Sequence, residues 1–167
     1  FVPDERVLAV RPYGVVDPPL QVISEIAFPI VSGAYLGVAE AAYEAAVTAA
    51  APRADSPLVQ RQVGRMRQLL QVASWSLDGA LAEVGEDVKP SPDAYLAVML
   101  AKAQVAEACL EVVDMAMEVA GGPAFFRGSA IERAYRDVRA VKFHPLTPEA
   151  THVESGRRAL GRPGMLA

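Results

Sequence analysis

The sequence is poor in cysteine, in clustered positive charge and in long apolar runs, and each shortage excludes a class of protein. The single cysteine, Cys109, cannot form an intrachain disulfide, which excludes a disulfide-stapled scaffold and fits a reducing cytoplasm. The 16 Lys and Arg residues are outnumbered by 20 Asp and Glu residues and form no cluster, so nucleic acid and anionic lipid are not expected partners. Polar residues interrupt every apolar run before it reaches the roughly 18 residues that cross a bilayer. These shortages predict a soluble cytoplasmic protein that binds neither nucleic acid nor membranes.

Apolar residues are abundant, since they make up 52% of the 167 residues. That share is too high for a disordered chain and supplies one full hydrophobic core or a large subunit interface. The chain opens with Phe1 instead of Met, and the residues that follow lack the anatomy of a signal peptide. We therefore expect this sequence to be part of a longer protein.

Three stretches predict long helices. The first spans residues 21–51 and is rich in small residues, with Pro29 expected to kink it or to mark its first turn. The second follows Ser56 and Pro57, and the third follows a polar connector in which Ser91 or Asp93 can serve as the N-cap. Apolar residues in the second and third stretches recur at steps of three and four, which is typical of helices packed nearly antiparallel. They are Val59, Val63, Met66, Leu70, Ala73, Leu77, Ala80 and Val84, then Leu96, Met99, Ala103, Ala106, Leu110, Val113, Met117 and Ala120.

Shorter elements flank these helices. Prolines near the N-terminus predict that residues 1–19 are extended, as a remnant of a preceding domain or linker. Gly121 and Gly122 end the third helix, after which Ser129 caps a short helix that reaches about residue 139. A last helix begins at Thr147 and ends at Gly161, and a tail follows over residues 162–167. The sequence thus predicts an all-α fold, an up-down bundle over residues 20–161 with three long helices and one or two shorter ones.

The glycine pair and the short helix carry a resemblance to a known family. Gly121-Gly122, about ten residues, and then Glu132-Arg133, Arg136 and Asp137 resemble the C-terminal helical domain of the acyl-CoA dehydrogenase superfamily. Its members hold FAD and oxidise acyl-CoA thioesters or, in one branch, hydroxylate small molecules. The resemblance runs from about residue 2 to residue 161. It begins with Val2, Pro3, Val7 and Leu8, which match the segment that closes the family's middle β-domain.

The resemblance implies residues that hold the cofactor. Arg53 stands sixteen positions after Gly37, like the family's arginine that reaches the FAD pyrophosphate of the neighbouring subunit. Gly121 and Gly122 match the family's glycines beside FAD, and Glu118 occupies a place where the family often has Gln. Thr147 matches a threonine near the flavin. The residues alone leave other readings open: Arg53 as a solvated loop residue, the glycines as a turn, and Thr147 as an N-cap.

The family's usual catalytic base is missing. Where the fatty-acid branch has a Tyr-Glu-Gly-Thr loop, this sequence has His144, Pro145, Leu146 and Thr147, and proline cannot take a proton. Other dehydrogenases supply the base from the first long helix, at the position held here by Ala27. Glu25 lies roughly 200° around the helix from that position, so we expect it to face elsewhere. The sequence therefore lacks both residues that the family's dehydrogenases use as the base in the dehydrogenation of an acyl-CoA.

His144 is the candidate catalytic residue. Flavin monooxygenases of the superfamily have a histidine a few residues after the Arg-Asp pair, beside the flavin and substrate, and His144 fits that spacing. A neutral imidazole can accept a substrate proton near neutral pH. The alternative from the residues alone is that His144 caps the short helix. His152 is predicted to be a surface residue, and Arg133, Arg136 and Asp137 a structural network that fixes the loop bearing His144.

The resemblance thus implies the C-terminal domain of an FAD-dependent oxidoreductase of the acyl-CoA dehydrogenase type, which acts on an acyl-CoA or a related small organic substrate. Copies of the domain are expected to associate as dimers or tetramers, and no metal is expected. Two alternatives stay open. One is a non-catalytic helical subunit that completes a partner's flavin site, and the other is a flavin-dependent monooxygenase that uses His144.

Overall fold

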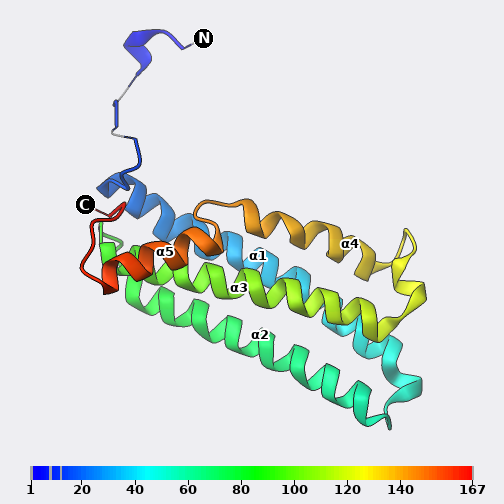
Figure 1. Cartoon of the computed structure of the whole chain (residues 1–167). Helices are drawn as coiled ribbons and strands as arrows, with labels where there is room; N and C mark the ends of the chain where they lie inside the picture. Colours follow the sequence, from blue (N-terminus) through cyan, green and yellow to red (C-terminus); the bar gives the residue numbers. More distant parts are fainter. Residues whose placement is uncertain (1, 8, 12, 167) are drawn as a thin grey trace.

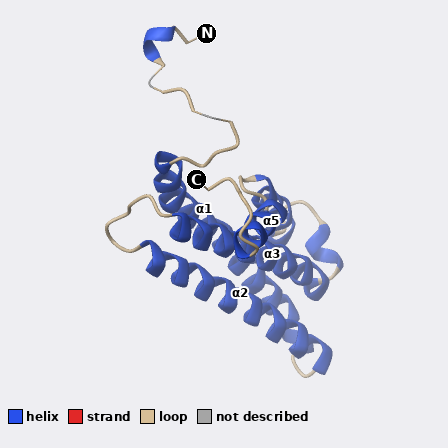
Figure 2. Cartoon of the chain, turned by 60° about the vertical axis from the view of Figure 1, so that its left-hand side comes forward, coloured by secondary structure: helices blue, strands red, loops and turns tan. Residues whose placement is uncertain are grey.

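The computed structural model describes residues 2–7, 9–11 and 13–166, and within them the chain forms a bundle of α-helices without a strand (Figures 1 and 2). Three long helices lie side by side, and two shorter ones lie along them. The predicted all-α bundle is therefore confirmed. The helices are α1, Pro18–Ala50; α2, Pro57–Val84; α3, Pro92–Ala120; α4, Ala130–Val138; and α5, Pro148–Ala159.

Helix α3 is the central element, because it contacts each of the other four helices. The predicted apolar stripe on α3 is correct as far as it goes, since Met99, Ala103, Ala106, Leu110 and Val113 are buried. Burial extends to other faces of the helix, however, which a stripe on one face did not predict. The further buried residues include Val98, Ala101, Val105, Ala108, Cys109, Val112, Ala116 and Val119.

Helix α1 packs against α3 through alanines. Ala39, Ala42, Ala46 and Ala50 are buried at steps of three and four, and their small side chains let the two backbones approach closely. Met66 of α2 is fully buried in the same core. Met66 and Met99 belong to the predicted apolar repeats of the second and third helices, and both are buried in the core as expected.

Helix α1 begins before its predicted start and runs through its proline. Pro18 occupies its first position, three residues before the predicted start, and Asp17 caps it by accepting from the Leu20 N–H at 3.1 Å. Pro29 is buried inside the helix, so the alternative that it marks the first turn is wrong. By length and composition alone this helix is apolar enough to cross a membrane, a test that core helices of soluble proteins also pass. In the bundle, α1 packs along α2, α3 and α4.

The helix starts follow proline and cap chemistry. Pro57, Pro92 and Pro148 open their helices, where a missing N–H costs nothing. Ser91 caps α3, since its hydroxyl accepts from the Ala94 N–H at 3.1 Å. Ser56, predicted to cap α2, stands at the N-cap position but makes no capping hydrogen bond through its side chain.

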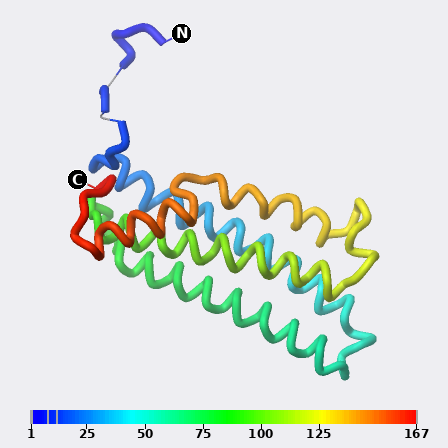
Figure 3. The backbone as a smooth tube through the Cα atoms, viewed as in Figure 1, coloured from blue at the N-terminus to red at the C-terminus, as the bar shows by residue number. Residues whose placement is uncertain are grey.

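The C-terminal tail meets the segment just before α1, whereas the first residues of the chain project away from the bundle (Figure 3). The Val16 N–H donates to the Met165 carbonyl at 2.8 Å, and Val16 pairs with Leu166 in an isolated parallel bridge. The Met165 N–H donates to the buried carboxylate of Glu154, also at 2.8 Å. The predicted tail is therefore folded back onto the start of α1. Leu8, which belongs to the N-terminal resemblance, lies outside the described residues.

Candidate functional site

The turn that carries His144 lies between α4 and α5 and is held against α1. The segment before it, Arg139–Phe143, is a short 3-10 helix whose Val141 is buried in the core. The His144 ring is half-buried, and its Nε2 lies 2.9 Å from the Tyr35 hydroxyl of α1. The two rings are 5.6 Å apart between centroids and tilted by 57°. His144 therefore has a fixed ring position inside the bundle, and the alternative of a simple helix cap gains no support from this hydrogen bond.

A buried lysine holds the backbone of the same turn. Lys102 of α3 is only 3% exposed, and its Nζ donates to the His144 carbonyl at 3.0 Å and to the Leu146 carbonyl. The ammonium also lies 5.3 Å from the centroid of the Phe28 ring, within the range of a cation–π contact. Burial lowers the pKa of Lys102 to about 8, because removal from water disfavours the charged form.

Thr147 begins α5 immediately after this turn. Its hydroxyl accepts from the Ala150 N–H at 3.3 Å, so it is the N-cap of that helix. The exposed Glu149 has a pKa below its ordinary value because its own backbone N–H and then the Thr147 hydroxyl donate to the carboxylate. Thr147 thus has a structural function that needs no ligand. It also keeps the His144 turn joined directly to a well-capped helix.

The other predicted cofactor residues gather at the end of the bundle where α1 and α3 finish, whereas the His144 turn lies beside the middle of α1. Arg53 lies in a short 3-10 turn that follows α1, and its guanidinium donates to the Val119 carbonyl near the end of α3. Glu118 is exposed beside it on α3, where it accepts from the Gln62 side chain at 3.4 Å. Arg53 has five N–H donors and is exposed, so one bond to a carbonyl leaves donors for a second partner.

The glycine pair completes this end. Gly121 ends α3 with a φ of 74°, a conformation that favours glycine, and its N–H donates to the Met117 carbonyl at 3.0 Å. A Cβ at Gly122 would meet no described atom within 4 Å, and its φ is not in the left-handed range. The turn alone therefore explains Gly121, whereas neither the backbone nor the packing of the described residues requires glycine at position 122.

An open hollow of about 540 Å³ lies beside the glycine pair. Its lining combines exposed aromatic rings with two cationic side chains, which suits a ligand with both apolar and anionic parts. The hollow is lined by Met117, Phe125, Phe126, Arg127, Glu132, Tyr135 and Arg136.

The predicted site residues therefore form two groups instead of one site. Tyr35, which contacts His144, and Arg53 are eighteen residues apart along α1 and the turn after it, or roughly 27 Å at 1.5 Å per residue. The first group, His144 and Thr147, lies in the turn between α4 and α5. The second group, Arg53, Glu118, Gly121 and Gly122, lies where α3 ends.

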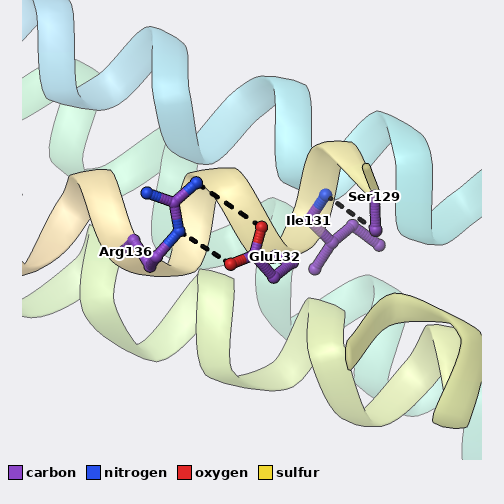
Figure 4. Close-up of polar contacts among 4 residues, drawn as sticks. All are labelled: Ser129, Ile131, Glu132 and Arg136. Carbon is purple, nitrogen blue, oxygen red and sulfur yellow. Dashed lines mark hydrogen bonds and ion pairs between the residues drawn. The ribbon is translucent and has the colours of Figure 1, made fainter. Parts of the chain in front are cut away.

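Helix α4 contributes one ion pair (Figure 4). Arg136 Nε lies 2.7 Å from Glu132 Oε1, and Ser129 caps the helix by accepting from the Ile131 N–H at 3.2 Å. The Ser129 cap was predicted. Arg133 and Asp137, expected in the network that fixes the loop, are exposed. The contacts that hold the loop come instead from Lys102 and Tyr35.

Helix α1 also carries Ala27, at the place of the alternative base, and Glu25 two residues before it. Ala27 is half-buried, and Glu25 is 1% exposed, about ten residues or roughly 15 Å along α1 from Tyr35. Its carboxylate oxygens have no hydrogen-bond partner among the described residues, and burial raises its pKa. Glu25 borders a hollow next to Leu81 and Val84 of α2. It therefore faces α2, away from the His144 turn.

Cys109 and His152 lie outside both groups of site residues. Cys109 is fully buried, and burial raises the pKa of its thiol to about 12, with a smaller contribution from the charge of Glu40. A thiol in that state is no nucleophile. His152 is exposed on α5, as expected for a surface residue.

Tyr35 and Lys102 were not identified from the sequence. A signal existed for Lys102, because it is a lone cation inside the apolar pattern of α3, between Met99 and Val105. A charge in such a place is rare unless it has partners. Tyr35 carried no comparable signal, since a tyrosine on a helix that is rich in apolar residues is ordinary.

Comparisons with known proteins agree with this architecture. Residues 30–149 match the family model described as "Acyl-CoA dehydrogenase, C-terminal domain". YdbM of Bacillus subtilis, provisionally named an acyl-CoA dehydrogenase, is 33% identical over 126 residues, which are 70% of this chain and 32% of that protein.

Solved structures share the fold. The acyl-CoA dehydrogenase of Slackia heliotrinireducens superposes with a TM-score of 0.76 at 28% identity, over 86% of this chain and 38% of that one. The 3-HSA hydroxylase of Rhodococcus sp. RHA1 superposes with a TM-score of 0.75 at 22% identity, over 84% of this chain and 38% of that one. The chain thus spans about a third of the length of these proteins.

Proposed function

Because the chain belongs to the acyl-CoA dehydrogenase family and matches its C-terminal domain, we propose that it is the helical part of an FAD-dependent oxidoreductase. The substrate is an acyl-CoA or a related small organic molecule. The rest of the flavin and substrate site belongs to parts of the protein outside this chain. The proposed assembly is a dimer or tetramer built through the bundle.

The observation that carries the proposal is the division of the predicted site residues between the middle of the bundle and one of its ends. One flavin contacts the turn that bears His144, beside the middle of α1. A second flavin, bound mainly by a neighbouring subunit, contacts Arg53, Gly121 and Gly122 at the end of the bundle where α3 finishes. A separation of roughly 27 Å along α1 suits one domain that serves two cofactors, and it explains why oligomerisation is part of the function.

The residues at the Arg53 end fit the anionic part of FAD. The exposed guanidinium has donors for phosphate oxygens, and a ligand can approach the backbone of Gly122 because no side chain stands there. The hollow beside the glycines adds Arg127 to the positive charge, whereas the charge of Arg136 is offset by its ion pair with Glu132. Glu118 opposes this charge and limits it. FAD, when bound, supplies the electron acceptor of the oxidation.

Beside the middle of α1, His144 is the residue proposed to move a proton. Its two ring nitrogens have different surroundings, because Nε2 shares a hydrogen bond with the Tyr35 hydroxyl. If Tyr35 accepts from Nε2–H, the lone pair lies on Nδ1, which is then the proton acceptor for a substrate. Tyr35 orients the ring in either tautomer, because its hydroxyl can donate or accept, while Lys102 holds the backbone of the same residue.

A flavin-dependent monooxygenase is the second candidate, and the absence of both standard bases favours it. Pro145 and Ala27 occupy the two places from which the family's dehydrogenases abstract a proton, and neither side chain can do so. A non-catalytic subunit that completes a partner's flavin site is the third candidate. It predicts a colourless protein when purified alone.

One set of measurements separates these candidates. The full-length protein that carries this chain is purified, and its flavin absorbance is recorded before and after a panel of short, medium and aryl acyl-CoA thioesters is added anaerobically. Bleaching identifies a dehydrogenase. Oxygen consumption with chemically reduced flavin and a phenolic substrate identifies a monooxygenase, and the lack of any bound flavin identifies the non-catalytic subunit.

The first prediction concerns His144 in the full-length holoenzyme. His144→Ala removes the proton acceptor, so turnover falls by about a hundredfold or more, within the range for loss of a general base. The FAD content stays unchanged, because the proposed phosphate-binding residues lie roughly 27 Å away along α1. His152→Ala is the matched control and keeps full turnover. Unchanged turnover in His144→Ala would remove His144 from the mechanism.

A further inference from the structure

We propose that Lys102 is a positioning residue that sets the place of the His144 imidazole by pinning the turn from His144 to Leu146 onto α3. The ammonium donates to the carbonyl oxygens of both residues, at 3.0 Å for His144. It comes from the central helix, 42 positions earlier in the chain. The proposal concerns the geometry of the turn, and its catalytic importance rests on the proposed function of His144.

The burial of Lys102 indicates that its contacts with the His144 turn are not incidental. A charged lysine that is 3% exposed has lost most of its hydration, and such a loss is tolerated only when protein groups replace the water. Here two carbonyl oxygens and the face of the Phe28 ring replace it. An apolar residue at position 102 would fill the core without that cost, but it would leave both carbonyls of the turn without their donor.

Two helices then fix His144 at two points. Lys102 of α3 holds its backbone carbonyl, and Tyr35 of α1 holds its ring nitrogen. The Leu146 carbonyl gives Lys102 a second point on the turn, so the peptide unit before Pro145 and the one after Leu146 are both held. A ring held at both ends has little freedom to move away from a reacting atom, and a displacement of about 1 Å in such a group can cost a hundredfold in rate.

The chain is well suited to a direct spectroscopic test. It contains two histidines, His144 and His152, and three lysines, of which Lys89 and Lys142 are exposed. Selective isotope labelling of histidine and lysine in the 167-residue chain therefore gives two imidazole and three ammonium signals that single substitutions assign. His152 and the exposed lysines are internal references.

The decisive variant is Lys102→Met, which keeps an unbranched apolar stem and removes the donor. We expect the imidazole signals of His144 to move toward those of the exposed His152, because the ring leaves Tyr35 when the turn is released. Lys142→Met is the matched control, since it removes a positive charge two residues before His144 from an exposed site, and both imidazoles keep their wild-type signals. A Lys102→Met chain that is folded and has the wild-type His144 signals would overturn the proposal.

A measurement on the unaltered chain covers the case in which Lys102→Met does not fold. The ammonium protons of Lys102 should exchange with water more slowly than those of Lys89 and Lys142, because all the contacts described above shield them. Their nitrogen signal should also show through-bond coupling to the carbonyl carbons of His144 and Leu146. A Lys102 ammonium that exchanges as fast as the two exposed ones would contradict the proposal.

A double-mutant cycle in the full-length holoenzyme separates this proposal from the proposed function. If Lys102 acts through His144, Lys102→Met lowers turnover about tenfold to a hundredfold with FAD retained, and the double variant with His144→Ala is no slower than His144→Ala alone. Full activity of His144→Ala would refute the function of His144 while the spectroscopic result stands. Additive losses in the double variant would refute the positioning proposal alone.

Discussion

At the scale of single residues, the His144 turn depends on side chains that stand far from it in the sequence. Tyr35 precedes His144 by 109 positions and Lys102 by 42, and both reach it only because α1 and α3 lie side by side. The sequence resemblance identified the histidine itself. It could not identify its supports, because a hydrogen bond to a backbone carbonyl leaves no periodic pattern in the sequence.

The buried ammonium of Lys102 predicts a specific dependence of stability on pH. Its pKa is about 8 in the folded chain and near the ordinary 10.5 in the unfolded chain. Between these two values the unfolded chain binds a proton that the folded chain has lost, so this residue makes the free energy of unfolding rise with pH. Below pH 8 both states are protonated and the contribution is constant.

Urea unfolding of the wild-type chain and of Lys102→Met across this pH range measures the effect. The difference in unfolding free energy between the two should change in favour of the wild type by up to about 1.4 kcal/mol per pH unit. Lys142→Met, whose lysine is exposed, should run parallel to the wild type. Parallel curves for the wild type and Lys102→Met would show that the folded-state pKa is ordinary.

At the scale of elements, the helices were predictable because local rules decide where they begin and end. The starts of α3, α4 and α5 follow the N-cap residues Ser91, Ser129 and Thr147, and a proline comes first in α3 and α5. Gly121 marks the end of α3. The steps of three and four in α2 and α3 gave one buried face of each. The central position of α3 was not predictable, since a stripe on one face does not reveal that other helices cover the remaining faces.

The contacts that the C-terminal tail makes with the bundle could not be predicted from the sequence either. Glu154 of α5 is buried, and its carboxylate accepts from the Met165 N–H in the C-terminal tail. The contact of Val16 with the Met165 carbonyl joins segments that are almost the whole chain apart. Such pairings depend on where the helices bring the termini, and no local pattern encodes them.

The two serine N-cap positions give a prediction at this scale. Ser91→Ala removes the hydrogen bond to the Ala94 N–H at the start of α3, so it should lower the free energy of unfolding by about 1 kcal/mol. Ser56→Ala is the matched control, because the Ser56 side chain makes no capping bond at the start of α2, and it should cost a few tenths of a kcal/mol at most. Chemical denaturation of the three chains measures both values. Equal losses would contradict the cap assignment.

At the scale of the whole molecule, the bundle holds the two groups of predicted site residues apart. The helices keep the His144 turn and the Arg53 end roughly 27 Å apart, and the core that sets this distance is built mainly from α1, α2 and α3. The proposed function assigns these two places to two flavin sites, one of the same subunit and one of a neighbouring subunit. Turnover and cofactor retention should therefore respond to different residues.

The measurement that tests this division most directly is the FAD content of the full-length protein carrying Arg53→Ala, compared with His144→Ala after identical purification. The account predicts that Arg53→Ala retains clearly less FAD than the wild type, because the phosphates lose a guanidinium donor, whereas His144→Ala retains the full amount and loses turnover. An Arg53→Ala protein with a full complement of FAD, or a His144→Ala protein that loses it, would contradict the account.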